Sequence, residues 1–295
     1  GVEPTEKGNF ISNLPAIGGA LEFDILGNTI NKWTGSITSD FFPEESPEGA
    51  TPIELGWLEF IQIHHETFAM NNGNYLALSG AYHSVSPELR ESLCPEDEVE
   101  WVALSDVVIE FNSDGELLRS WDLWDVIDFE EMPTGHMCVA TGLRASETIR
   151  DWTHANAVIY DETRDAILIS SRHTDQIVAF DHLDEMGHQS SLRWILGVNG
   201  TIPLEGDQFY HPHAIELQTD GSILLYDNGN TRPDPVKYSR AVQYQINDQS
   251  ADPSEWTATQ VWEHTDYYES GEPVYAAFLS DADRTENGNV LITHG

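Results

Sequence analysis

One stretch of the chain decides the fold: His213 is followed eight residues later by Gly221, which opens Gly221-Ser222-Ile223-Leu224-Leu225-Tyr226. The same spacing occurs earlier, where the run Gly73-Asn74-Tyr75-Leu76-Ala77-Leu78 begins eight residues after His65. A glycine turn followed by a short β-rich run predicts a hairpin. A related unit begins at His154, and the hairpin pattern returns near the end of the chain. Repetition of one unit at a fixed period is typical of a repeat architecture.

Each of these inner hairpins is followed by a second hairpin that ends in a tryptophan. Those tryptophans are Trp121, Trp194 and Trp262. His154 and His213 lie 59 residues apart, and four strands in such a unit indicate a β-propeller blade. We therefore predict an all-β protein, a β-propeller with three whole blades and two half-blades.

The outer half-blade is predicted at 21–35 and the inner one at the end of the chain. The two halves either close one blade between them or belong to a larger ring. For domains, we expect an N-terminal segment at 1–56 and propeller blades at 57–295 that form part of one domain. Short helices are predicted near 87–93 and 123–129, the first capped by Ser86.

The composition is strongly acidic, with 51 Asp and Glu against 13 Lys and Arg and a formal net charge of −38 at pH 7. Such a surface repels phosphate backbones and anionic lipids, so we expect no nucleic-acid partner. A large carboxylate excess with few lysines is typical of halophilic proteins, in which salt screens the repulsion. An ordinary acidic exported protein is the alternative interpretation.

The two cysteines, Cys94 and Cys138, fit no metal-binding spacing, and two alternatives stay open: a disulfide or two buried thiols. No apolar stretch is long enough to span a membrane. The chain begins at Gly1, so we expect any signal peptide or anchor to be removed already or to lie outside this sequence.

Histidines are the candidate functional residues, since 12 of them are present and several occupy related positions. His65, His154 and His213 each lie at the start of a predicted inner strand. In a propeller the inner strands line the central channel, so equivalent positions from successive blades converge at one end of it.

Two further groups strengthen this prediction. Asn156 lies two residues after His154, hence on the same strand face. Arg172 and His173 follow the predicted strand 166–170. A planar guanidinium is suited to a tetrahedral oxyanion such as sulfate or phosphate.

Several motifs now stand in one order along the chain. They are Asp151-Trp152-Thr153-His154-Ala155-Asn156-Ala157-Val158, Ser170-Ser171-Arg172-His173, His213, Tyr226-Asp227-Asn228-Gly229 and Tyr238-Ser239-Arg240. Over roughly residues 57–265 the chain resembles the arylsulfate sulfotransferase family. The resemblance implies a six-bladed β-propeller, often exported, that moves a sulfuryl group from an aryl sulfate to a phenol without a nucleotide donor. It also implies that no cofactor and no metal take part.

The resemblance further implies that His213 attacks sulfur and becomes a transient sulfohistidine. A neutral imidazole is a good nucleophile near neutral pH, and a covalent intermediate divides the transfer into two ping-pong steps. His154, Asn156 and Arg172 match groups that bind the sulfuryl oxygens, and His65 matches a histidine near the aryl oxygen. The predicted catalytic residues are His213, His154, Arg172 and His65, and the predicted substrate-binding residues are Asn156, His211 and His173.

The chain departs from the family pattern at two places: Pro212 stands where a glutamine usually precedes the nucleophile, and Glu66 replaces an aspartate. Two other functions stay open. One is a metal centre, because imidazoles bind Zn²⁺ and Cu²⁺; its ligands would come from His211, His213, His64, His65 and His154. The other is a propeller that binds a ligand without catalysis.

For partners, we expect an aryl sulfate and a phenol, no membrane insertion, and an exported location. A homodimer is left open.

Overall fold

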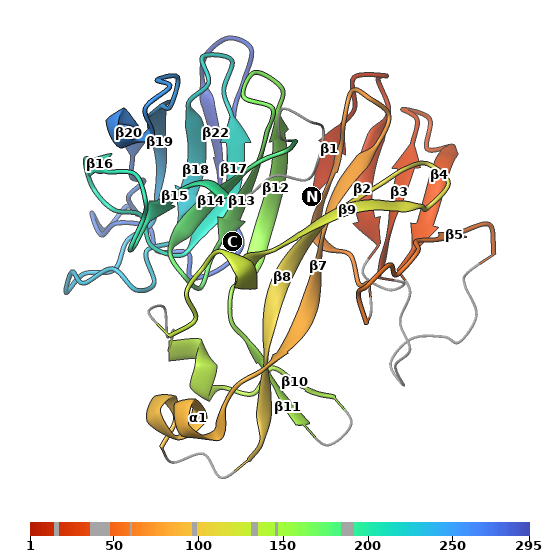
Figure 1. Ribbon diagram of the computed structural model, residues 1–295. Coiled ribbons are helices and arrows are strands. Elements are labelled where there is room, and N and C mark those ends of the chain that lie inside the picture. The colour runs from red at the N-terminus through yellow and green to blue at the C-terminus, as the bar shows by residue number, and fades with distance from the viewer. Residues whose placement is uncertain are drawn as a thin grey trace. The chain divides into compact units, whose positions relative to one another are not determined.

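The computed structural model describes residues 1–14, 18–35, 48–59, 61–95, 99–130, 135–144, 147–183 and 192–295. The chain divides into two compact units, Gly1–Val158 and Ile159–Gly295, and each is described by itself. Both units are built almost entirely from antiparallel sheets, with one short α-helix among the described residues (Figure 1). The predicted all-β class is confirmed.

The first unit opens with a five-stranded sheet in the order β1-β2-β3-β4-β5. Its strands are β1 (Val2–Pro4), β2 (Phe10–Leu14), β3 (Gly19–Phe23), β4 (Thr29–Thr34) and β5 (Thr51–Pro52). The hairpin expected as a lone half-blade at 21–35 is therefore part of a larger sheet, and that prediction is wrong. Strands β1 and β2 escape a search for apolar runs because they are short and polar residues interrupt them.

The second sheet of this unit has the order β10-β11-β8-β7-β6, with β9 also paired to β8. The strands are β6 (His64–Ala69), β7 (Tyr75–Ser84), β8 (Trp101–Phe111), β9 (Leu117–Asp122), β10 (Gly142–Arg144) and β11 (Glu147–Asp151). Strands β7 and β8 pair from Tyr75 opposite Phe111 to Ser84 opposite Val102. This long hairpin extends beyond the sheet to helix α1 (Pro87–Leu93), as Figure 1 shows.

A disulfide between Cys94 and Cys138 links the end of helix α1 to a segment 44 residues later in the chain. Helix α1 follows its predicted range, with Ser86 as N-cap accepting a hydrogen bond from the Leu89 N–H at 3.2 Å. The helix expected at 123–129 is shorter: only the 3₁₀ turn η2 (Leu123–Asp125) forms. A second 3₁₀ turn, η3, covers Gly135–Cys138.

The core of the first unit is centred on the fully buried Trp33 of β4. Its indole lies 4.4 Å from the ring of Tyr75 and 5.4 Å from that of Phe111, centroid to centroid. These contacts pack the first sheet onto the second, and apolar burial of this kind supplies most of the folding free energy. Trp33, Trp121 and Trp194 are buried, and Trp262 is partly buried against a core cluster of the second unit.

The second unit contains three sheets. The first has the order β12-β13-β14-β15, and its strand β12 begins in the first unit; the second has the order β16-β20-β19-β18-β17; the third is the pair β21-β22. The strands are β12 (Ala155–Asp161), β13 (Ala166–Ser171), β14 (Gln176–Asp181), β15 (Leu192–Gly197), β16 (Leu204–Glu205), β17 (Pro212–Leu217), β18 (Ile223–Asp227), β19 (Arg240–Asn247), β20 (Thr257–His264), β21 (Asp281–Arg284) and β22 (Val290–Thr293). A 3₁₀ turn, η4 (Pro253–Glu255), precedes β20.

A buried ion-pair network joins two sheets of this unit through Asp248. The Arg164 guanidinium, from the β12–β13 turn, donates to Asp248 at 2.9 Å, and Arg193 of β15 donates to the same carboxylate at 2.9 Å. The Trp194 indole N–H adds a third hydrogen bond at 3.1 Å. Burial alone would raise the pKa of Asp248, but these donors outweigh it and hold the pKa below its ordinary value.

The described residues form four sheets of four or more strands and one strand pair. The predicted count of three whole blades and two half-blades stays a prediction. Seven predicted strand segments fall within or one residue from observed strands: 75–78, 107–111, 166–170, 177–180, 222–226, 241–246 and 290–293. Closure of the sheets into a propeller, and the domain boundaries at 1–56 and 57–295, stay predictions.

Candidate active site

The predicted site residues fall into two clusters, one in each unit. His65, His154 and Asn156 belong to the first unit. Arg172, His173, His211 and His213 belong to the second.

In the first unit, two predicted histidines come together, and a third joins them. The rings of His65 and His154 lie 5.1 Å apart between centroids. His64, at the start of β6, places its Nδ1 atom 2.9 Å from Nδ1 of His65. We call His64, His65 and His154 the triple-histidine cluster. Asn156 is buried in β12, two residues beyond His154.

Asp106 of β8 contacts this cluster through both of its carboxylate oxygens. Its Oδ1 atom lies 3.1 Å from Nε2 of His64. Its Oδ2 atom accepts hydrogen bonds from the hydroxyl of Thr153 and, at 2.6 Å, from the N–H of Ala155. The same buried carboxylate therefore fixes His64 and both neighbours of His154 in the chain.

The pKa of His64 lies above its ordinary value. Burial alone would lower it, because a low-dielectric environment disfavours the cation. The hydrogen bond to Asp106 and the charges of Asp106 and Asp151 outweigh this effect. His64 therefore remains cationic to a higher pH than an exposed histidine.

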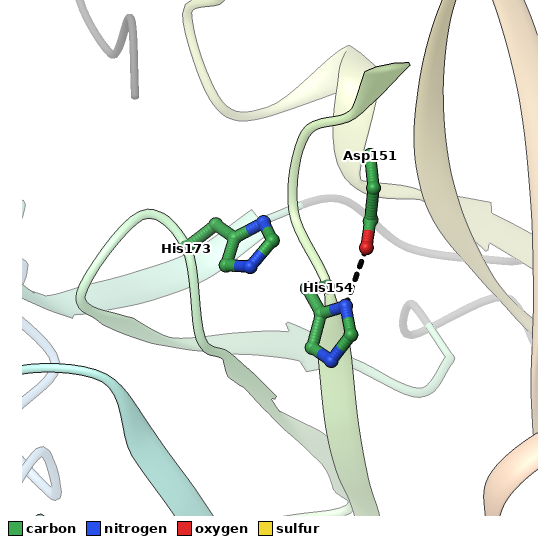
Figure 2. A group of neighbouring side chains, drawn as sticks. All are labelled: Asp151, His154 and His173. Atoms are coloured by element: carbon green, nitrogen blue, oxygen red, sulfur yellow. Dashed lines mark hydrogen bonds and ion pairs between the residues drawn. The ribbon is translucent and has the colours of Figure 1, made fainter. Parts of the chain in front are cut away.

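His154 is oriented by Asp151, the last residue of β11. Its Nδ1 atom lies 2.5 Å from Oδ2 of Asp151, and Figure 2 shows the two side chains directed toward one another. Strand β11 pairs in parallel with β8, with Asp151 opposite Leu104, which delivers the following residues to Asp106. Because Nδ1 of His154 contacts Asp151, the Nε2 atom lies on the opposite side of the ring.

In the second unit, the predicted residues gather where β13 ends and β17 begins. The Ser170 hydroxyl donates to the Pro212 carbonyl at 3.3 Å, so the residues after each lie close together. The rings of His173 and His211 are 5.9 Å apart. Arg172 is buried, and its guanidinium donates to the Ala277 carbonyl at 2.9 Å. We call Arg172, His173, His211 and His213 the Arg-His cluster.

Asp175, in the β13–β14 turn, holds His211 at two points. Its Oδ1 atom accepts the His211 backbone N–H at 2.6 Å and lies 3.1 Å from Nδ1 of the ring. The Thr231 hydroxyl donates to the other carboxylate oxygen at 2.7 Å. With Nδ1 as the donor to Asp175, the lone pair of the His211 ring is on Nε2.

Three of these histidines have a strained backbone. His65, His154 and His211 have φ values of 52°, 49° and 55°, in the left-handed region that non-glycine residues rarely adopt. Each such residue costs about 1–3 kcal/mol and is retained where the surroundings over-determine it, typically at functional sites. The shared conformation is independent support for a functional role of these positions.

The strand register corrects one sequence interpretation. Spacing to the turn glycine makes His65 the counterpart of His213, since both lie eight residues before it. In the sheets, His213 lies opposite Tyr226, five residues after its glycine, and it is His64 that lies opposite the corresponding Leu78. The bulge in β6 contains an additional residue, which shifts the count by one.

Pro212 is accommodated because β17 is an edge strand of its sheet and Pro212 is its first residue. Proline is tolerated at such positions, where no ladder partner requires its missing N–H.

Sequence reasoning missed the carboxylates that orient the histidines: Asp106, Asp151 and Asp175. Asp106 carried a usable signal, because a lone aspartate within the apolar run of β8 has to be compensated when buried. Asp175 carried none, since an aspartate in a tight turn is ordinary.

His64 is poorly placed to bind a metal ion. Both ring nitrogens of His64 already interact with protein groups, Asp106 and His65.

Comparison with known proteins identifies the class. The model of the arylsulfotransferase (ASST) family matches residues 1–295, and the chain belongs to this family. It is 23% identical over 294 residues to the arylsulfate sulfotransferase AssT of Escherichia coli O6:H1, covering 80% of this chain and 45% of that protein. A second protein of that name, from Lelliottia amnigena, is 23% identical over 266 residues, covering 70% of this chain and 40% of that protein. The chain therefore spans less than half the length of these relatives.

Among solved structures, similar chains include a Bacteroides caccae protein of unknown function (TM-score 0.37, 11% identity, covering 92% of this chain and 83% of that chain). A Lactobacillus plantarum protein has a TM-score of 0.41 at 10% identity, covering 99% of this chain and 69% of that chain. Neither likeness assigns the fold. No helix among the described residues is long and apolar enough to cross a membrane.

Proposed function

We propose that this chain transfers a sulfuryl group from an aryl sulfate to a phenol by a ping-pong mechanism, with His213 as the nucleophile. The observation that carries the proposal is the meeting of Arg172, His173 and His211 beside β17, on which His213 lies. A nucleophilic imidazole and a buried guanidinium on neighbouring strand ends are the two groups that this reaction needs most.

In the first step, a His213 ring nitrogen forms a bond to sulfur while the bond from sulfur to the aryl oxygen breaks. The electron pair of that bond leaves with the aryl oxygen, which takes a proton to become the phenol. In the second step, the oxygen of an acceptor phenol attacks the same sulfur, loses its proton, and releases His213 unmodified. Arg172 stabilises the negative charge on the sulfuryl oxygens in both steps.

The resemblance to the family assigns the remaining roles in this proposal to His154, Asn156 and His65. His154, held by Asp151, donates an N–H to a sulfuryl oxygen, as does the amide of Asn156. His65 donates the proton to the departing aryl oxygen and takes it back from the acceptor. These roles follow the family resemblance, with Asp106 and Asp151 as the orienting groups.

We further propose that the protein is exported. The Cys94–Cys138 disulfide supports this, because structural disulfides form and persist mainly in oxidising compartments. The net charge of −38 supports a saline environment.

Mass spectrometry of the protein quenched during turnover of 4-nitrophenyl sulfate tests the mechanism. We expect a gain of one sulfuryl mass on the peptide that contains His213, and no gain in His213→Ala, which should also lose phenol release. His182→Ala removes a buried histidine of the same unit outside the Arg-His cluster, and should retain turnover. Phenol release by His213→Ala at the parental rate would exclude His213 as the nucleophile, and stoichiometric zinc or copper in active protein would favour the metal alternative.

A further inference from the structure

The contact between His64 and His65 joins two like atoms. Both partners are Nδ1, 2.9 Å apart, a normal hydrogen-bond distance. Two imidazole nitrogens at this distance share one proton, so one donates and the other accepts. The tautomer of each ring therefore depends on that of the other.

The other nitrogen of His64 is fixed by its surroundings. Nε2 lies 3.1 Å from the carboxylate of Asp106 and 3.3 Å from the carbonyl of Ser79, and both groups are acceptors. Nε2 of His64 therefore carries a proton in either charge state. On the His64 ring, the proton that can vary is therefore the one between the two Nδ1 atoms.

We propose that Asp106, His64 and His65 form a proton relay in which the charge state of His64 sets the tautomer of His65. When His64 is cationic, its Nδ1–H donates to His65, and the proton of neutral His65 lies on Nε2. When His64 is neutral, its Nδ1 accepts, so His65 has its proton on Nδ1 and a lone pair on Nε2. His64 acts through His65 and is a positioning residue.

The relay gives His65 both roles that a ping-pong transfer requires, and in this respect the inference rests on the proposed function. As the aryl oxygen leaves, it takes the proton from Nε2 of His65, and Nδ1 of His65 takes the proton from Nδ1 of His64. His64 ends neutral, still bound to Asp106. In the second half-reaction the acceptor phenol gives its proton to Nε2 of His65, and the shared proton returns to His64.

The groups around the pair favour the cationic start of this cycle. Facing it are Asp106 from β8, Asp151 from the end of β11, and the His154 ring. The Gly1 amino group donates a hydrogen bond to the His65 carbonyl at 3.1 Å. For His64, the hydrogen bond to Asp106 and the charges of Asp106 and Asp151 favour the cation.

Leaving-group dependence tests the relay in catalysis. Phenyl sulfate releases a phenolate whose conjugate acid has a pKa of about 10, whereas 4-nitrophenolate leaves readily without a proton. We expect His64→Gln to lower turnover of phenyl sulfate by about 10²-fold and to change that of 4-nitrophenyl sulfate little. The matched control is His83→Gln, because His83 is a half-buried histidine of the same unit bound to Asp122 at 2.9 Å. This control should not change the ratio of the two rates, and an equal loss on both substrates in His64→Gln would overturn the relay.

A nitrogen NMR titration of the intact protein tests the relay without any activity. In protein labelled with ¹⁵N-histidine, the signals of His65 should change from the Nε2–H to the Nδ1–H form as His64 loses its proton, with assignments taken from His64→Gln and His65→Gln. A His65 tautomer that stays constant through this titration would refute the relay. If the protein turns over neither aryl sulfate, the proposed function fails, and the NMR result still decides whether the relay exists.

Discussion

Asp175 holds His211 twice, accepting the backbone N–H at 2.6 Å and lying 3.1 Å from the ring Nδ1. One side chain therefore fixes both the position of the strand end and the tautomer of the imidazole. Asp106 has a comparable role in the first unit, where it contacts His64 and accepts the N–H of Ala155. In both clusters, a buried carboxylate from a different strand or turn pre-organises a histidine, which lowers the reorganisation that the reaction would otherwise require.

This arrangement predicts the effect of Asp175→Asn. An asparagine keeps the volume but weakens the hold on His211, so we expect turnover to fall at least about tenfold while the fold is retained. The matched control is Asp165→Asn, because Asp165 also has a positive φ, 49° against 57° for Asp175, and also contacts a histidine, His182. Steady-state kinetics of both variants provide the measurement. An equal loss in both would show that the effect is structural.

The network around Asp248 predicts a loss of stability in Asp248→Asn. Removing this charge leaves Arg164 and Arg193 with one carboxylate fewer in a buried setting, which we expect to cost about 3 kcal/mol of unfolding free energy. The pKa of Asp248 is lowered, so its contribution is present above its unfolded value, near 3.8, and is lost as the pH falls through the folded value. Urea titrations at pH 7 and in the acid range should show the gap between parent and variant closing only in acid. A gap that is constant with pH would contradict the role of the charge.

We predict that the Cys94–Cys138 disulfide raises the thermal stability of the protein. Cys94 and Cys138 are 44 residues apart in sequence, and closing a loop of this size is expected to stabilise a protein by about 4 kcal/mol. We expect a reductant to lower the melting temperature of the parent and leave that of the double variant Cys94→Ala/Cys138→Ala unchanged. Equal sensitivity of both proteins to the reductant would exclude the disulfide as the cause.

The charge predicts the salt dependence of activity. A net charge of −38 repels an anionic aryl sulfate at long range, and at about 1 M salt the screening length falls to about 3 Å. Contacts at hydrogen-bond distance, such as those of Arg172, are screened much less. We therefore expect turnover to rise from low to molar salt, with circular dichroism recorded at each point to separate the effect from folding. A monotonic fall in turnover while the fold stays constant would contradict this prediction.

The sequence alone determined the all-β class, most strand positions, helix α1 and the family. These features depend on local patterns: a glycine turn before an apolar run, a capping serine before proline, and ordered motifs around His154, Arg172 and His213. The sequence also identified which histidines to examine, because the number of residues between each histidine and the following turn can be counted directly.

Tertiary structure alone decided which groups surround each histidine. The extra bulge residue in β6 makes His64, and not His65, the counterpart of His213 in the strand register. Asp106 lies 42 residues from His64 in sequence, and Asp175 lies 36 from His211, so no local pattern pairs them. Tertiary structure also decided between a disulfide and free thiols, because the pairing of Cys94 with Cys138 depends on the distance between two segments that are far apart in sequence. Sequence spacing determines which side chains lie on the same face of one strand. The contact between a carboxylate and an imidazole from different strands forms only when those strands pack together.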